Sequence, residues 1–114
     1  MSIIIVAIFQ NCSQTETLNF TKDEQVWLAE HPTITLSVDD TYPPLNFRND
    51  DNDIVGNNVD LIEVIEKRLG INIILVGSDW NSALQKAMNH EVDGIVNASP
   101  VVERMTKLVF THAI

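Results

Sequence analysis

Charged, aromatic and small polar residues follow three predicted strands of the chain, at the point where each strand ends. They are Asp39, Asp40 and Tyr42 after the first strand, Ser78, Asp79 and Trp80 after the second, and Asn97, Ser99 and Arg104 after the third. Asp39 can neutralise an ammonium group, Arg104 can hold a carboxylate through two parallel hydrogen bonds, and the rings can enclose the carbon between them. These groups suit a zwitterion, so they predict a binding site for a small solute.

Each of these residues also has a purely structural interpretation. Trp80 lies on the apolar stripe of its predicted helix and would fit a core. Tyr42 precedes two prolines and could stiffen a turn, Asp39 could be a solvated turn acid, and Arg104 could pair with a surface carboxylate. The prediction of a site therefore depends on their joint placement at one edge of a sheet.

The elements that would position these side chains alternate between helix and strand. A capping box at Thr21–Glu24 begins a short helix that ends before Pro32, and the β-branched run 33–38 predicts a strand. Asn, Asp and Gly over 48–58 predict a turn or tight hairpin. Asn58 is the expected N-cap of a helix that runs to Gly70, with Glu63 and Lys67 paired on its outer face.

The second half repeats this alternation. The run 71–76 is apolar on both faces, which is typical of a strand covered by helices on both sides. Ser78 or Asp79 caps a helix with an apolar stripe from Trp80 to Met88, and further strands are expected at 92–97 and 108–111. We therefore predict an α/β fold, in which a largely parallel sheet forms the middle of three layers. In such sheets ligands bind outside the carboxyl ends of the strands.

Composition excludes several other classes of function. The 114 residues carry a net charge of -9 and only seven scattered basic residues, which argues against a nucleic-acid partner. Cys12 is the single cysteine and the three histidines lack ligand spacing, so neither a disulfide nor a metal site is expected. An EF-hand loop at Asp51 fails because Val55 and Ile62 occupy ligand positions. No cofactor is implied.

Catalysis lacks support in the sequence. Asp39 and Asp40 are the one candidate acid pair, and no base accompanies them at a supported position. No GxSxG nucleophile motif occurs. The apolar run Ile3–Phe9 is far shorter than the roughly 20 residues of a membrane span. We interpret 1–19 as a degraded signal or export segment and 20–114 as the folded unit.

Five blocks of the sequence carry a resemblance to a known family, in matching order and spacing. They are the lead-in FTKDEQVWLAEHPTITLSVDDTYPPLNF, the GxxxDLIxxIxxRLG helix, the WxxALxxAM helix, VDGI, and SPxxER with the following LVFT. Over 20–111 the chain resembles the first lobe of bacterial solute-binding proteins of family 3, the periplasmic amino-acid-binding type. The WLAEHP element is similar to those of sensor kinases.

The resemblance implies a Venus flytrap of the type II periplasmic-binding-protein fold, which closes on a small solute. Carried over by position, Asp39 matches the acid on the ammonium side and Arg104 the carboxylate-binding arginine. Tyr42 and Trp80 match the stacking aromatic residues, and Asn97 and Ser99 match polar contacts of the first lobe. Two positions depart from the pattern: Val101 replaces a usual threonine, and Asn97 is larger than usual, so the expected solute extends to related carboxylates.

The resemblance also implies a second lobe, which this chain lacks, so 20–114 is expected to be a truncated first lobe. The favoured hypothesis is a periplasmic, non-catalytic, solute-binding lobe of a transmembrane sensor such as a hybrid histidine kinase. The alternative is a receptor fragment of an ATP-driven amino-acid importer. An enzyme of the same fold, a dehydratase or a lobe accompanying a lytic transglycosylase, is the lower alternative. The partners would be the solute, a second lobe and a membrane-embedded signalling or transport protein.

Overall fold

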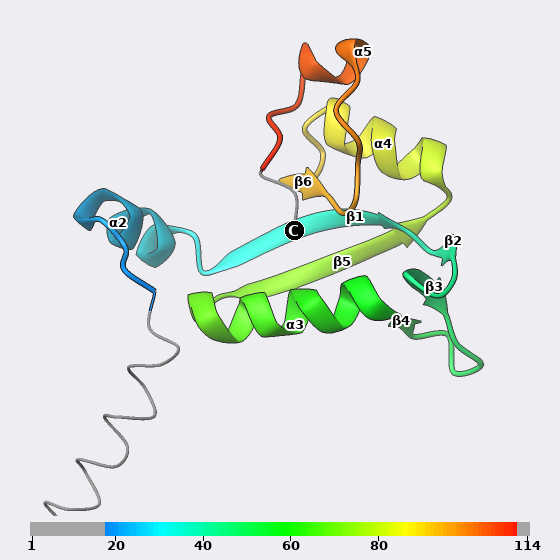
Figure 1. Ribbon diagram of the computed structural model, residues 1–114, viewed down its shortest axis with the longest axis horizontal. Coiled ribbons are helices and arrows are strands. Elements are labelled where there is room, and N and C mark those ends of the chain that lie inside the picture. Colours follow the sequence, from blue (N-terminus) through cyan, green and yellow to red (C-terminus); the bar gives the residue numbers. More distant parts are fainter. Residues whose placement is uncertain (1–17, 112–114) are drawn as a thin grey trace, which may run out of the picture.

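A computed structural model describes residues 18–111, and its centre is a parallel sheet of three strands (Figure 1). Strand β1 (Thr33–Asp39) lies in the middle, between β5 (Asn72–Ser78) and β6 (Gly94–Ile95). Both neighbours run parallel to β1. The strands are rich in β-branched residues, which suit a pleated and partly buried surface. The predicted α/β class with a parallel sheet is confirmed.

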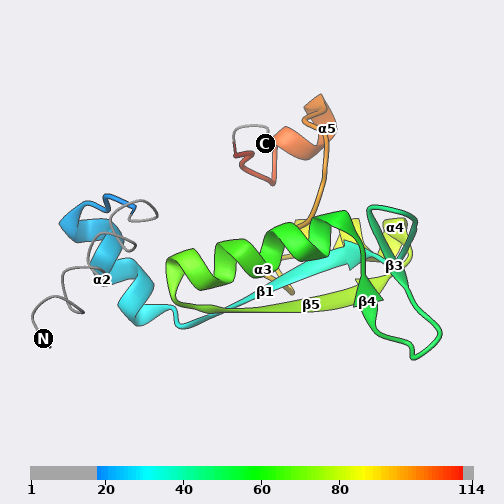
Figure 2. The same ribbon diagram turned by 60° about the horizontal axis from the view of Figure 1, so that its bottom comes forward.

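Two helices cover the sheet, one on each side, which gives the three layers (Figures 1 and 2). Helix α3 (Asn57–Leu69) contacts β5, and α4 (Trp80–Met88) contacts β1 most extensively. The core contains Val38, Val59, Ile71, Ala83 and Ala87. The small alanines let α4 approach the sheet so closely that the buried Ser37 hydroxyl donates a 2.8 Å hydrogen bond to the Ala83 carbonyl.

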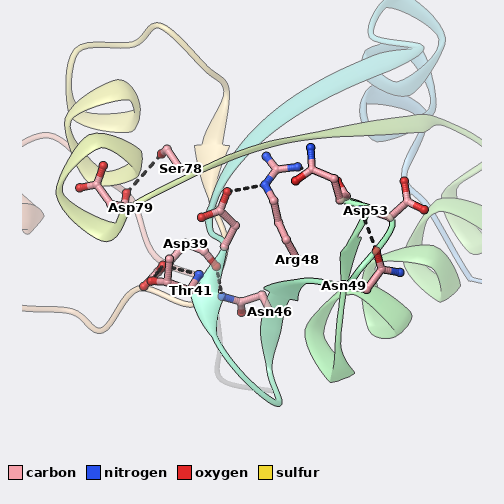
Figure 3. Close-up of polar contacts among 10 residues, drawn as sticks. Asp39, Thr41, Asn46, Arg48, Asn49, Asp53, Ser78 and Asp79 are labelled. Atoms are coloured by element: carbon pink, nitrogen blue, oxygen red, sulfur yellow. Dashed lines mark hydrogen bonds and ion pairs between the residues drawn. The ribbon is translucent and has the colours of Figure 1, made fainter.

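A second, antiparallel sheet follows the carboxyl end of β1. It contains β2 (Thr41–Tyr42), β3 (Asn46–Arg48) and β4 (Ile54–Val55). The Asn49 side chain organises the β3–β4 turn, because its Oδ1 accepts hydrogen bonds from the backbone N–H groups of Asp51 and Asp53 at 3.0 and 2.9 Å (Figure 3). The predicted hairpin is confirmed, and we call β2–β4 the hairpin sheet.

The predicted helix boundaries are correct at three places and wrong at one. Thr21 and Glu24 form the capping box of α2 (Lys22–Glu30), and Gly70 ends α3 in the left-handed conformation. Asp79, one of the two residues considered, caps α4. Asn58 does not cap α3. Gly56 occupies the N-cap position, and the Asn58 amide instead donates a 2.8 Å hydrogen bond to the Asn46 side chain.

Four other expectations are wrong. Strand β6 has two residues rather than six, and within residues 18–111 the run 108–111 forms no strand; a short helix α5 (Val102–Met105) precedes it. Ile74 of β5 is 51% exposed, so helices do not cover both faces of this strand. No ion pair joins Glu63 to Lys67 among the residues that the structure describes.

The short strand has a physical reason. Strand β6 is in register with β1 at Gly94 and Ile95, its flanking Asp93 and Val96 N–H groups donate to β1 carbonyls, and no described strand lies on its other side. Among residues 18–111, no helix is long and apolar enough to cross a membrane. The segment 1–17 lies outside the described residues, so the interpretation of 1–19 as an export signal falls almost entirely there.

Candidate functional site

The carboxyl ends of β1 and β5 lie level with each other. Asp39 is the register partner of Ser78, and the Asp40 N–H donates a 2.9 Å hydrogen bond to the Ser78 carbonyl. Because β1 and β5 are parallel, the residues that follow them leave the sheet at one edge. Figure 3 shows Asp39, Ser78 and Asp79 at this edge, which we call the carboxyl edge.

Asp39 is held by the first residues of the hairpin sheet. Its Oδ1 accepts hydrogen bonds from the Thr41 N–H at 2.9 Å and the Thr41 hydroxyl at 2.6 Å (Figure 3). The buried Asn46 amide donates to the Asp39 backbone carbonyl, which fixes the end of the strand. Within residues 18–111, Oδ2 of Asp39 receives no hydrogen bond. One carboxylate oxygen is thus occupied, while the other remains open to an ammonium group.

Trp80, Ser99 and Arg104 lie together although they belong to different segments. The Arg104 Cζ lies 5.2 Å from the centroid of the Trp80 ring, which is the distance of a cation–π contact. Its Nη1 donates a 3.0 Å hydrogen bond to the Ser99 carbonyl. Trp80 begins α4, whereas Arg104 belongs to α5, so the contact joins two helices. Four donors of the guanidinium stay free of hydrogen bonds within the described residues.

The remaining two candidates, Tyr42 and Asn97, follow β1 and β6. Tyr42 is 54% exposed on β2. Asn97 follows β6, is exposed, and has a positive φ of 65°, a conformation that Asn tolerates better than most residues. Within residues 18–111, no side-chain hydrogen bond ties Tyr42 or Asn97 to the other candidates. Their roles stay predictions.

A shallow depression of about 620 Å³ lies at the opposite end of the sheet, near the amino ends of β1 and β5. Pro32, Gly70 and Asn72 are among its lining residues, and none of the six candidates is. Among the described residues, no cluster of three His, Cys, Asp or Glu side chains could hold a metal ion.

The local structure lowers the pKa of the Asp79 carboxyl. The Ser82 hydroxyl and N–H donate hydrogen bonds of 2.7 and 3.2 Å to its oxygens, and these bonds lower the pKa of the Asp79 carboxyl from its ordinary value of 3.8. The ionised carboxylate also lies at the positive end of the α4 dipole. Both Asp79 carboxylate oxygens accept hydrogen bonds from Ser82 of α4, so we assign Asp79 a capping role.

The Asp79 cap predicts a pH-dependent contribution to stability. A carboxyl whose pKa is lower in the folded chain stabilises the fold when ionised; that contribution is complete above the unfolded pKa and is lost as the pH falls through the folded pKa. Asp79→Ala should therefore lower the free energy of unfolding at pH 7, and the difference from the parent chain should shrink as the pH falls from about 4 towards 2.

Urea unfolding followed by circular dichroism across this pH range measures the difference. Asp50→Ala is the control, because Asp50 is an exposed turn residue whose carboxylate makes no hydrogen bond in the described part of the chain. The capping role would be contradicted if the free energy of unfolding of Asp79→Ala differed from that of the parent chain by the same amount at pH 7 and at pH 2.

The sequence analysis missed Arg48 of β3. Its Nε forms a 2.8 Å ion pair with Oδ2 of Asp40, and its Nη1 donates a 3.0 Å hydrogen bond to the Asn52 carbonyl. Asn46 and Arg48 are two residues apart on β3, so their side chains share one face of this strand. Both in fact contact β1 or the residue after it.

Comparison with known proteins gives a consistent result. Residues 34–114 match the family model of bacterial extracellular solute-binding proteins, family 3. A probable histidine-binding protein of Campylobacter jejuni is 32% identical over 103 residues, which cover 88% of this chain and 38% of that protein. The L-cystine-binding protein TcyJ of Escherichia coli K12 is 26% identical over 80 residues, 70% of this chain and 30% of TcyJ.

A solved structure supports the fold assignment. The substrate-binding protein of a polar amino acid ABC uptake transporter from Streptococcus thermophilus superposes with a TM-score of 0.66 at 27% identity, covering 76% of this chain and 33% of that one. The first-lobe architecture expected from the sequence thus agrees with a type II periplasmic-binding-protein fold. The chain spans 30% to 43% of the length of the curated relatives that it matches.

Proposed function

Because this chain belongs to the bacterial extracellular solute-binding proteins of family 3, we propose that it is an amino-acid-binding lobe whose ligand lies at the carboxyl edge. Its named relatives are binding proteins and not enzymes. The observations that carry the proposal are an anionic group at the end of β1 and a cationic group on α5 beside Trp80. Within residues 18–111, one Asp39 carboxylate oxygen and four Arg104 donors make no hydrogen bond, and the Arg104 guanidinium lies over the Trp80 ring.

The two charges suit the two ends of an amino acid. The α-ammonium would bind the Asp39 carboxylate, and the α-carboxylate would accept parallel hydrogen bonds from Arg104. Trp80 is already stacked with Arg104, so its ring can cover the aliphatic part of the ligand. The Ser99 carbonyl accepts a hydrogen bond from Arg104 and thereby orients the guanidinium. Tyr42 and Asn97 complete the proposed set as exposed side chains able to close over the solute.

One lobe supplies only part of a flytrap. A partner lobe would bury the solute from the other side, and ligand binding would then select the closed state. With contacts from one side alone, the described lobe should bind roughly in the millimolar range. The family is extracellular, and the periplasm is the compartment that we propose.

Two contexts fit a binding lobe of this kind. A transmembrane sensor is favoured by the helix α2, which precedes β1 and carries the WLAEHP element resembling sensor kinases. An importer receptor is favoured by the names of the relatives, which bind L-cystine or histidine or serve an uptake transporter. The two contexts differ in the partner: a membrane-embedded kinase for a sensor, and a permease for a receptor.

An NMR titration of the ¹⁵N-labelled chain tests the binding function at millimolar affinity. L-Histidine is the probe, histamine is the matched compound that lacks the carboxylate, and imidazole-4-propionate is the one that lacks the ammonium group. We expect saturable shifts at the Trp80 indole N–H and the Arg104 side chain with L-histidine, and much weaker responses to both analogues. Equal responses to all three compounds, or none to any L-amino acid, would overturn the proposal.

A further inference from the structure

Arg48 and Asp40 meet above a glycine of the central sheet. The ion pair joins Arg48 Nε to Asp40 Oδ2 at 2.8 Å, and the Asp40 side chain is only 14% exposed. Directly beneath the pair is Gly77 of β5. A Cβ at this position would lie 2.7 Å from Arg48 Nη2 and 2.8 Å from Asp40 Oδ2. The absence of a side chain at Gly77 therefore provides the space in which the two charges meet.

The pair joins the hairpin sheet to the carboxyl edge. Arg48 belongs to β3, whereas Asp40 directly follows β1. Figure 3 shows Arg48 extending from the hairpin sheet, while Asp39 turns instead towards Thr41. A second bond from Arg48 to the Asn52 carbonyl holds the guanidinium at the base of the β3–β4 turn. Two contacts thus fix the Arg48 guanidinium, and its positive charge lies next to the Asp40 carboxylate.

Three carboxylates lie at this edge, and two of them are already used. Asp79 is held by Ser82 at the start of α4, and Asp40 is neutralised by Arg48. Asp39 and Asp79 are the two carboxylates at this edge whose charge no cation compensates among the described residues. Asp79 uses its oxygens to cap α4, so Asp39 is the uncompensated carboxylate that keeps an oxygen without a hydrogen bond within residues 18–111. The Arg48 pair limits the negative charge that surrounds this oxygen.

We infer that Arg48 is a specificity-determining residue: by neutralising Asp40 over Gly77, it lowers the affinity of the carboxyl edge for amino acids with basic side chains relative to those with uncharged side chains. This inference rests on the proposed amino-acid-binding function. Without the guanidinium, the Asp40 carboxylate adds a further negative charge next to Asp39, and a positive charge on the ligand side chain becomes more favourable. Arg48 acts through Asp40, so it is a positioning residue and need not touch the ligand.

The test compares L-arginine with L-glutamine, which share the zwitterionic backbone and differ in side-chain charge. NMR titration gives the ratio of their dissociation constants for each variant of the chain. Arg48→Met should shift this ratio about tenfold in favour of L-arginine, the size of effect that one additional charge near a partly solvated site produces. Arg68→Met is the matched control, because Arg68 is exposed in the last turn of α3 and should leave the ratio unchanged.

A double variant separates charge from structural disruption. Asp40→Asn combined with Arg48→Met removes both charges, so the ratio should return to that of the parent chain. A ratio that stays shifted in the double variant, or never shifts in Arg48→Met, overturns the role of Arg48 while leaving the binding function intact. If the parent chain responds to neither amino acid, the binding function itself is overturned, and the specificity role falls with it.

Discussion

Arg104→Ala is expected to abolish measurable binding of any solute that carries a carboxylate. Two charge-assisted hydrogen bonds contribute about 1.5 to 3 kcal/mol each, so their loss should weaken binding by a hundredfold or more. The structure adds a reason for a large effect, because Arg104 is also the partner of the Trp80 ring. The variant therefore removes the anion-binding group and exposes the aromatic surface that would cover the ligand.

The same NMR titration measures this loss, and the choice of ligand makes it specific. Binding of L-histidine should disappear in Arg104→Ala, whereas the weak response to histamine, which has no carboxylate, should stay as it is in the parent chain. Lys107→Ala is the control, since Lys107 is an exposed cation three residues further along the chain. Unchanged affinity for L-histidine in Arg104→Ala would contradict the site assignment.

Gly56→Ala should destabilise the fold by about 3 kcal/mol or more, the sum expected for strained backbone and for forced contacts in a tight space. Gly56 has a φ of 132°, which L-residues rarely adopt. A Cβ there would collide with the Leu45 carbonyl oxygen and lie 2.6 Å from its carbon and 2.8 Å from the Pro44 oxygen. All three are backbone atoms, so no side chain can move aside.

Gly56→Ala would weaken the contact between the start of α3 and the hairpin sheet. The N–H groups of Asn57 and Asn58 donate to the carbonyls of Pro44 and Leu45 at 3.1 and 3.0 Å, which joins the start of α3 to the hairpin sheet. Gly70→Ala is the matched control, because Gly70 has a φ of 69° but open space around its Cβ position. Urea unfolding should show a much larger loss for Gly56→Ala; equal losses would mean that the close approach has no effect.

Local sequence signals predicted the elements whose cause is local. The capping box of α2 needs only Thr21 and Glu24, and the left-handed end of α3 needs only Gly70. The alternation in 33–38 is likewise contained within β1. The placement of Asp39 beside Ser78 followed from the parallel sheet and is confirmed by the register. These features needed no knowledge of distant partners.

The errors concern features that depend on distant residues. Asn58 has the chemistry of a cap, but Gly56 is required two residues earlier by the approach of Leu45, and Asn46 takes the Asn58 amide. The run 92–97 has strand composition, but its pairing with β1 ends at Ile95. The Arg48–Asp40 pair depends on Gly77, a residue of a different strand. Sequence spacing alone does not contain these contacts.

The contacts of Arg104 also affect the entropy of binding. A long, flexible side chain that becomes fixed by a ligand loses rotamer freedom, which costs about 0.5 to 1.5 kcal/mol. Arg104 has already lost part of that freedom, because the Trp80 ring and the Ser99 carbonyl limit where its guanidinium can lie. Part of the rotamer entropy of Arg104 is therefore already lost on folding, before a solute binds. A ligand at the carboxyl edge would meet an arginine that is already oriented, and more of its interaction energy would remain as affinity.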